Sequence, residues 1–96
     1  MREGARILCV GNEMTLLRIR SQVLAHAGYS SQTATVKDAA ELISKETFDL
    51  VIVAAFLSEA ERRRVLSAAG DTPTLVLQGL AVPPELLAAI EAKLSN

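Results

Sequence analysis

Three short apolar runs stand out along the chain, each bounded by polar or turn-forming residues. They comprise Arg6–Val10, residues 49–54 and residues 74–77. Continuous apolar runs of this length are typical of parallel strands that are buried on both faces. Residues 29–34 are more polar and alternate, which favours a short strand at the edge of a sheet. The pattern therefore predicts four strands.

Between these strands, apolar residues recur at intervals of three and four, which predicts helices. The helices cover residues 13–27, Val36–Lys45, residues 58–69 and residues 85–94. Asn12 and Thr35 are the expected N-caps of the first two helices, Gly28 ends the first, and Pro83 opens the last. Strands that alternate with helices predict an α/β fold, with a doubly wound parallel sheet and helices on both faces.

The composition restricts the classes of function. The 96 residues suffice for one domain over residues 1–96, with no room for a second core. The net charge of −1, with both signs interspersed, gives no electrostatic case for binding nucleic acid or a membrane surface. The longest apolar run, residues 50–57, is far shorter than the roughly 20 residues of a membrane span. A single cysteine, Cys9, excludes an internal disulfide, and a cytoplasmic location is expected.

The middle apolar run ends on Ala54, at the kind of position where open α/β sheets place their ligand sites. Ala54, Ala55 and Phe56 carry no group that ionises, attacks or coordinates. Gly11 favours a tight turn over a nucleotide site, because the dinucleotide fingerprint needs three glycines. Glu13 is more typical of an acid in the first turn of a helix than of a metal ligand. The residues themselves therefore predict no catalytic group.

Two further features have an ordinary structural interpretation. The three arginines at residues 62–64 are flanked by Glu59 and Glu61 in a predicted helix, which favours a solvated face with ion pairs over a nucleic-acid patch. His26 stands alone, without a second histidine or a cysteine near it, and is expected at the surface. No metal site and no cofactor are predicted.

Six segments, in the right order, resemble the receiver domains of response regulators, the flavodoxin-like and CheY-like modules of two-component signal transduction. The matching segments are residues 7–10, 27–29, 38–43, 48–53, 72–77 and 83–87. No single segment is specific, but their order covers nearly the whole chain. The resemblance implies the receiver fold.

Receivers take part in a phosphorelay by catalysing their own phosphorylation with five side chains at the carboxyl edge of the sheet. By the resemblance, the two acidic residues that help to hold Mg²⁺ match Gly11 and Asn12. The phosphoacceptor aspartate matches Ala54, the hydroxyl residue matches Gln78, and the nearest counterpart of the lysine is Val82. The resemblance thus implies a degenerate phosphoacceptor pocket of Gly11, Asn12, Ala54 and Gln78, a pseudo-receiver. Phosphorylation by the family mechanism is not expected.

The chain is also shorter than the family pattern. Only Leu80, Ala81 and Val82 separate Gly79 from Pro83, where a receiver has its fourth helix and fifth strand. The implied sheet has four strands in the order 2-1-3-4, so the fourth strand becomes an edge that can pair with another chain. The residues of this possible interaction edge are Thr74, Leu75, Val76 and Leu77. A homodimer or a protein partner is expected there.

The leading hypothesis is a signal-transduction or scaffolding module, without enzymatic activity, that acts through protein–protein contact. The alternative is a small-ligand or anion-binding α/β domain that uses the vacated pocket at the carboxyl edge. A ligand should raise the melting temperature of such a domain by mass action, whereas a pure interaction module should respond only to partners.

Overall fold

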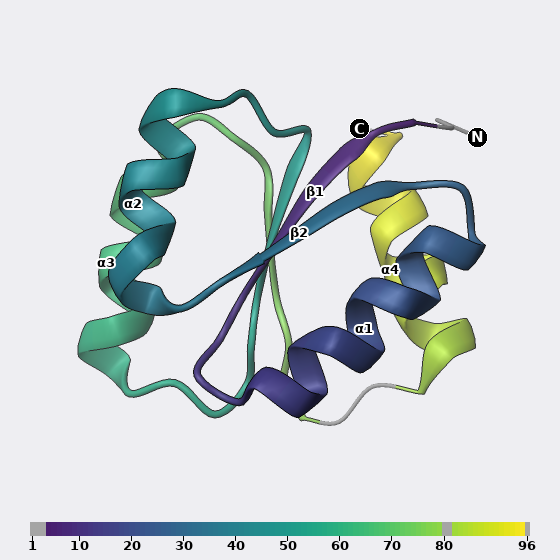
Figure 1. Cartoon of the computed structure of the whole chain (residues 1–96), viewed down its shortest axis with the longest axis horizontal. Helices are drawn as coiled ribbons and strands as arrows, with labels where there is room; N and C mark the ends of the chain where they lie inside the picture. Colours follow the sequence, from purple (N-terminus) through teal and green to yellow (C-terminus); the bar gives the residue numbers. More distant parts are fainter. Residues whose placement is uncertain (1–3, 80–81, 96) are drawn as a thin grey trace.

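A computed structural model describes residues 4–79 and 82–95 of the chain, and strands and helices alternate throughout them (Figure 1). The elements are β1 (Arg6–Val10), α1 (Met14–His26), β2 (Ser30–Ala34), α2 (Val36–Lys45), β3 (Leu50–Val53), α3 (Glu59–Ala69), β4 (Thr74–Val76) and α4 (Pro83–Leu94). The fold is therefore the predicted α/β alternation.

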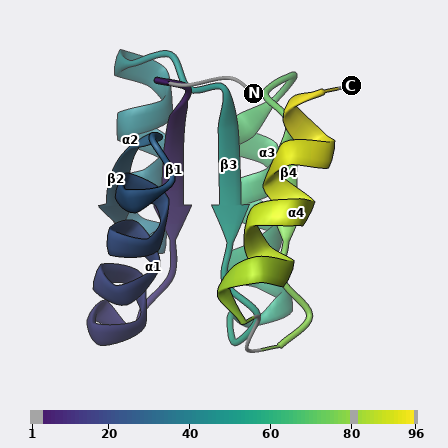
Figure 2. The ribbon, with the colours of Figure 1, turned by 90° about the vertical axis from the view of Figure 1, so that its right-hand side faces the viewer.

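The four strands form one parallel sheet in the order β2-β1-β3-β4, as predicted. In the centre, Leu8 of β1 stands opposite Val51 of β3, and the two strands run side by side in the same direction (Figure 2). On the outer side of β3, Ile52 stands opposite Leu75 of β4. This register brings the carboxyl ends of β1, β3 and β4 to one edge of the sheet, which is where a ligand site is expected.

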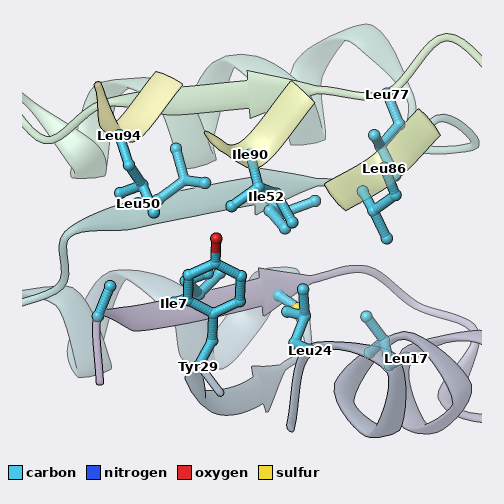
Figure 3. Close-up of a cluster of buried hydrophobic side chains, with 12 residues drawn as sticks. Ile7, Leu17, Leu24, Tyr29, Leu50, Ile52, Leu77, Leu86, Ile90 and Leu94 are labelled. Atoms are coloured by element: carbon cyan, nitrogen blue, oxygen red, sulfur yellow. The ribbon is translucent and has the colours of Figure 1, made fainter. Parts of the chain in front are cut away.

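The helices cover both faces of the sheet. Helices α1 and α4 lie on one face and α2 and α3 on the other (Figure 1). The side chains of β1 and β3 point alternately to the two sides, so each face has its own apolar core. On the α1–α4 face, Ile7 and Ile52 pack with Leu17 of α1 and Ile90 of α4 (Figure 3). All residues of β3 are fully buried, which explains why its sequence is an unbroken aliphatic run.

Helix α1 ends just before Gly28, as the sequence predicts. Gly28 has a φ of 93°, in the left-handed region that favours glycine. The N–H of Tyr29 then donates to the carbonyl of Leu24 at 3.0 Å, which satisfies one of the free carbonyls at the end of the helix. The chain turns sharply here and enters β2 at the edge of the sheet.

Several predicted boundaries and faces are wrong by small amounts. β3 ends at Val53 and β4 at Val76, one residue earlier than predicted, although the N–H groups of Ala54 and Leu77 still donate to strand carbonyls. Ile19 is 53% exposed because it lies on the side of α1 away from Leu17. The predicted link over Leu80 and Ala81 lies outside the described residues.

Within residues 4–79 and 82–95, no helix combines the length and the apolar character that crossing a membrane requires.

Candidate functional site

The candidate site lies at the carboxyl edge of the sheet, where the turns after β1 and β3 meet. The N–H of Ala54 donates to the carbonyl of Val10 at 3.0 Å, so the residue after β3 stays attached to the end of β1. A Cβ built on Gly11 would lie 3.0 Å from the Cβ of Ala54 and 3.4 Å from Cδ2 of Leu17. The two turns are therefore so close that glycine is the residue that fits at position 11 without displacing a neighbour.

Asn12 does not cap α1, which corrects the sequence prediction. The N-cap is Glu13, whose own carboxylate accepts from the N–H of Thr15 at 3.1 Å. The Asn12 side chain turns the other way, and its Nδ2 donates to Oε2 of Glu61 at 2.9 Å. A hydrogen bond to a charged acceptor competes well with a cap bond to a backbone amide, so Asn12 ties the β1–α1 turn to the start of α3.

The start of α3 is built by a capping box. The hydroxyl of Ser58 accepts from the N–H of Glu61 at 3.1 Å, and the carboxylate of Glu61 accepts from the N–H of Ser58 at 3.0 Å. The backbone N–H of Ser58, with the Asn12 amide adding to it, holds the pKa of Glu61 below its usual range. The spacing Ser58-x-x-Glu61 is the sequence signal for this motif, which the sequence analysis did not use.

A pocket of about 210 Å³ opens at this edge between α1 and the turns. Gly11, Asn12 and Ala54 line it, and so does Gly79 after β4. Gln78 is exposed and is not among the lining residues, so the structure does not bring it to the other three.

The pocket walls are mostly apolar. The apolar lining residues are Leu16, Leu17, Ala54, Ala55, Phe56 and Leu57. Phe56 is 74% exposed at the mouth of the pocket. A surface of this kind can hold a small apolar group, but it offers no nucleophile.

Arg20 is the lining residue that the sequence analysis missed. It lies three residues after Leu17 and four before Leu24, the two buried residues of α1, so a charged side chain falls on the buried face of the helix. Its Nη1 atom is buried and has no hydrogen-bond partner among the described residues. The spacing of 17, 20 and 24 was the available signal.

Glu13 also lines the pocket, where its carboxylate caps α1, whereas Cys9 and Asp49 are not among the lining residues. Burial raises the pKa of the Cys9 thiol to about 11, and the charge of Arg20 partly opposes this rise. Asp49 lies at the amino end of β3, where its carboxylate accepts from the N–H of Arg6 at 2.8 Å. Over the described part of the chain, no three His, Cys, Asp or Glu side chains cluster in a way that could hold a metal ion.

Solved structures with the same architecture identify the fold. Chemotaxis protein CheY4 of Vibrio cholerae matches with a TM-score of 0.76 and 21% identity, over 94% of this chain and 98% of that chain. A CheY-like receiver domain protein of Methanospirillum hungatei matches with a TM-score of 0.70 and 21% identity, over 97% and 95% of the two chains. The chain has the receiver fold.

A third receiver structure agrees with the first two. The signal receiver domain of a LuxO repressor protein from Vibrio parahaemolyticus has a TM-score of 0.65 and 16% identity, over 96% of this chain and 91% of that chain. No protein-family model and no curated protein sequence matches the chain. The predicted receiver fold, with its four strands in the order 2-1-3-4, is thus confirmed by structure, at sequence identities that show the fold alone.

Proposed function

We propose that this chain is a non-catalytic signal-transduction or scaffolding module, a receiver-like domain that has lost its phosphoacceptor site and acts through protein–protein contact in the cytoplasm. The observation that carries the proposal is the residue at the carboxyl end of β3. Ala54 stands there, where the receiver resemblance places the phosphoacceptor, and a methyl group has no lone pair with which to attack phosphorus.

The neighbouring residues support the same conclusion. The resemblance places the Mg²⁺-binding acids at Gly11 and Asn12, and the Asn12 amide is already engaged with Glu61. Mg²⁺ demands several oxygen ligands in near-octahedral geometry, which one glycine and one amide do not provide. The Cβ of any other residue at position 11 would also lie 3.0 Å from the Ala54 Cβ.

Asp49 does not replace the missing carboxylate. It begins the segment that leads into β3, while the pocket lies beyond the opposite end of that strand. Five residues at about 3.3 Å each separate it from Ala54, which is roughly 17 Å. Glu13 lies closer, but its carboxylate caps α1 through the N–H of Thr15.

The proposed contact surface is the outer edge of β4. The N–H of Val51 donates to the carbonyl of Pro73 and the N–H of Leu77 donates to the carbonyl of Val53, so Pro73 and Leu77 face β3. Because pairing alternates along a parallel strand, the backbone groups of Thr74 and Val76 face the open side. All three residues of β4 are partly exposed. An apolar edge strand of this kind is a template for adding a strand from a second copy or from a partner protein.

The contact surface is tested by the mass of the protein in solution. We expect the wild type to form a dimer at high concentration, or to bind a partner, in a manner that Val76→Lys abolishes. Ser30→Lys, at the exposed start of the opposite edge strand β2, is the matched control and should leave the association unchanged.

Val76 also packs partly against the core on the α2–α3 face, so the unfolding midpoint of each variant must be measured alongside its mass. Thr74→Lys, at the other position of β4 whose backbone faces the open side, provides a second test. A wild-type protein that stays monomeric and binds no partner, or variants that associate like the wild type, would contradict the contact at β4.

A further inference from the structure

The half-buried Arg20 is the feature of the pocket that the proposed function does not use. Every arginine is charged at any pH at which proteins fold, so its N–H groups need acceptors. Nη1 of Arg20 is buried without one among the described residues, although the side chain lines an open pocket. A buried donor on a charged group costs more to leave unpaired than a neutral one does. The guanidinium of Arg20 therefore has hydrogen-bonding capacity that no described residue uses.

Several other basic side chains of this protein form hydrogen bonds or ion pairs. The guanidinium of Arg6 donates to the carbonyl of Thr47 at 3.1 Å and pairs with Glu46. Lys45 pairs with Glu41 at 2.7 Å, and Arg63 pairs with Glu59 at 3.0 Å. Arg62 also has an unpartnered atom, Nε, but it does not line either described pocket. Arg20 alone among these combines an unpaired buried atom with a pocket.

Arg20 is half-buried. It lies on the face of α1 that carries Leu17 and Leu24, and its charge is felt by the Cys9 thiol, which is buried in β1. Arg20 and the 74% exposed Phe56 both line the pocket. A molecule in the pocket can therefore lie against a cation and an aromatic ring.

The chemistry of the walls selects among anions. Beyond Arg20, most of the lining is aliphatic or aromatic, and it contains no second cation. Glu13 also lines the pocket with its carboxylate held near the start of α1, which disfavours a doubly charged ligand. The guanidinium fork matches the two oxygens of a planar carboxylate, whereas a phosphate would leave oxygens against apolar walls. A volume of about 210 Å³ is below the roughly 300–1,000 Å³ of sites for drug-sized ligands.

We propose that the pocket at the carboxyl edge binds a small monocarboxylic acid, with its carboxylate on Arg20 and a short apolar chain against Leu16, Ala55 and Phe56. This gives the vacated receiver pocket a ligand of defined class, so the domain responds to a metabolite-sized acid in place of a phosphoryl group. The inference concerns the pocket, and it does not depend on the contact at β4.

The test is an NMR titration of the ¹⁵N-labelled protein with butanoate, followed at the backbone amides of Gly11, Ala54, Ala55 and Phe56. We expect saturable shifts at these amides with butanoate and none of comparable affinity with butanamide, which has the same shape without the charge. Inorganic phosphate should bind more weakly than butanoate. These comparisons use the wild-type protein and need no variant.

Arg20→Met and Arg18→Met form a matched pair on the same helix. Arg18 is exposed and does not line the pocket, so its variant should bind butanoate like the wild type. Arg20→Met removes an unpaired buried cation and keeps the aliphatic length, so it should fold in the absence of ligand. We expect its affinity for butanoate to fall by at least about tenfold.

Three outcomes would overturn the proposal. The first is the absence of saturable shifts with any monocarboxylate, in which case water satisfies Arg20. The second is equal binding by Arg20→Met, and the third is tighter binding of phosphate than of butanoate. The contact at β4 is read from the solution mass, so either proposal can fail while the other stands.

Discussion

Gly11→Ala adds a single methyl group at the point where the turns after β1 and β3 meet. The new Cβ would lie 3.0 Å from the Ala54 Cβ and 3.4 Å from Cδ2 of Leu17. The first distance is well inside ordinary carbon–carbon contact, which is about 3.5–4.0 Å, so the turns must separate or the Leu17 side chain must move. Because β1 and β3 are joined along their length, a small separation at this end strains the central pair of strands.

The expected cost follows from two opposing effects. Overpacking a close-packed site costs about 1–3 kcal/mol of unfolding free energy. Replacing glycine by alanine recovers about 0.4–1 kcal/mol through the unfolded state, because the backbone of Gly11 is not in the left-handed region. We therefore expect a net loss of roughly 0.5–2 kcal/mol, which lowers the melting temperature of a domain of this size by several degrees.

The assay is urea unfolding of Gly11→Ala, Ala54→Gly and the double variant. If the two methyl groups collide, Gly11→Ala should cost about 1 kcal/mol less in the Ala54→Gly background, since a coupling of this size is typical of residues in contact. Gly79→Ala is the matched control, because a Cβ there meets nothing within 4 Å. That control should be neutral or slightly stabilising. The close approach of the two turns would be refuted if Gly11→Ala unfolded at the same urea concentration as the wild type. It would also be refuted if Gly11→Ala lowered the unfolding free energy equally with Ala54 and with Gly at position 54.

Three further results are expected. The pKa of Cys9, about 11 against 9.0 for a free thiol, means that the unfolded chain loses this proton first as the pH rises. The unfolding free energy should therefore fall by about 2 kcal/mol between pH 9 and 11, and a Cys9→Ala variant that shows the same fall would disprove the cause. Ser58→Ala removes the cap of α3 and should lower the unfolding free energy, measured with urea, by about 1 kcal/mol. Ser67→Ala, at an exposed position of the same helix, should lower it little, and equal losses for the two variants would contradict the capping box. Ile52→Val should lower the unfolding free energy by about 1 kcal/mol because Ile52 is fully buried, and Ile19→Val should lower it clearly less. A larger loss for Ile19→Val than for Ile52→Val would contradict the position of the core.

The order of the elements could be predicted because it rests on strong local signals. An unbroken aliphatic run can be accommodated only where both faces of a strand are covered, as they are along β3. The left-handed turn at Gly28 is likewise a property of one residue and its neighbours. Such features do not depend on which distant segments come together.

The candidate site was harder to predict, because it depends on contacts between distant residues. Asn12 has the right chemistry for a cap, but Glu61, which is far along the chain, accepts its amide hydrogen bond. Gln78 was assigned to the pocket by its place after β4, and the structure leaves it exposed outside the lining. Arg20 was visible in the spacing of α1, yet only the folded chain shows that its Nη1 atom is buried without a hydrogen-bond partner among the described residues.

The loss of the phosphoacceptor is the central claim, and it has a direct test. The protein is incubated with acetyl phosphate and Mg²⁺ beside a receiver domain that retains its aspartate, and the intact mass of each is measured. We predict that the mass of this chain does not change, and that Ala54→Asp alone does not change this result, since Gly11 and Asn12 still provide no acidic pair for the metal. The appearance of one added phosphoryl group on the wild-type protein would contradict the account.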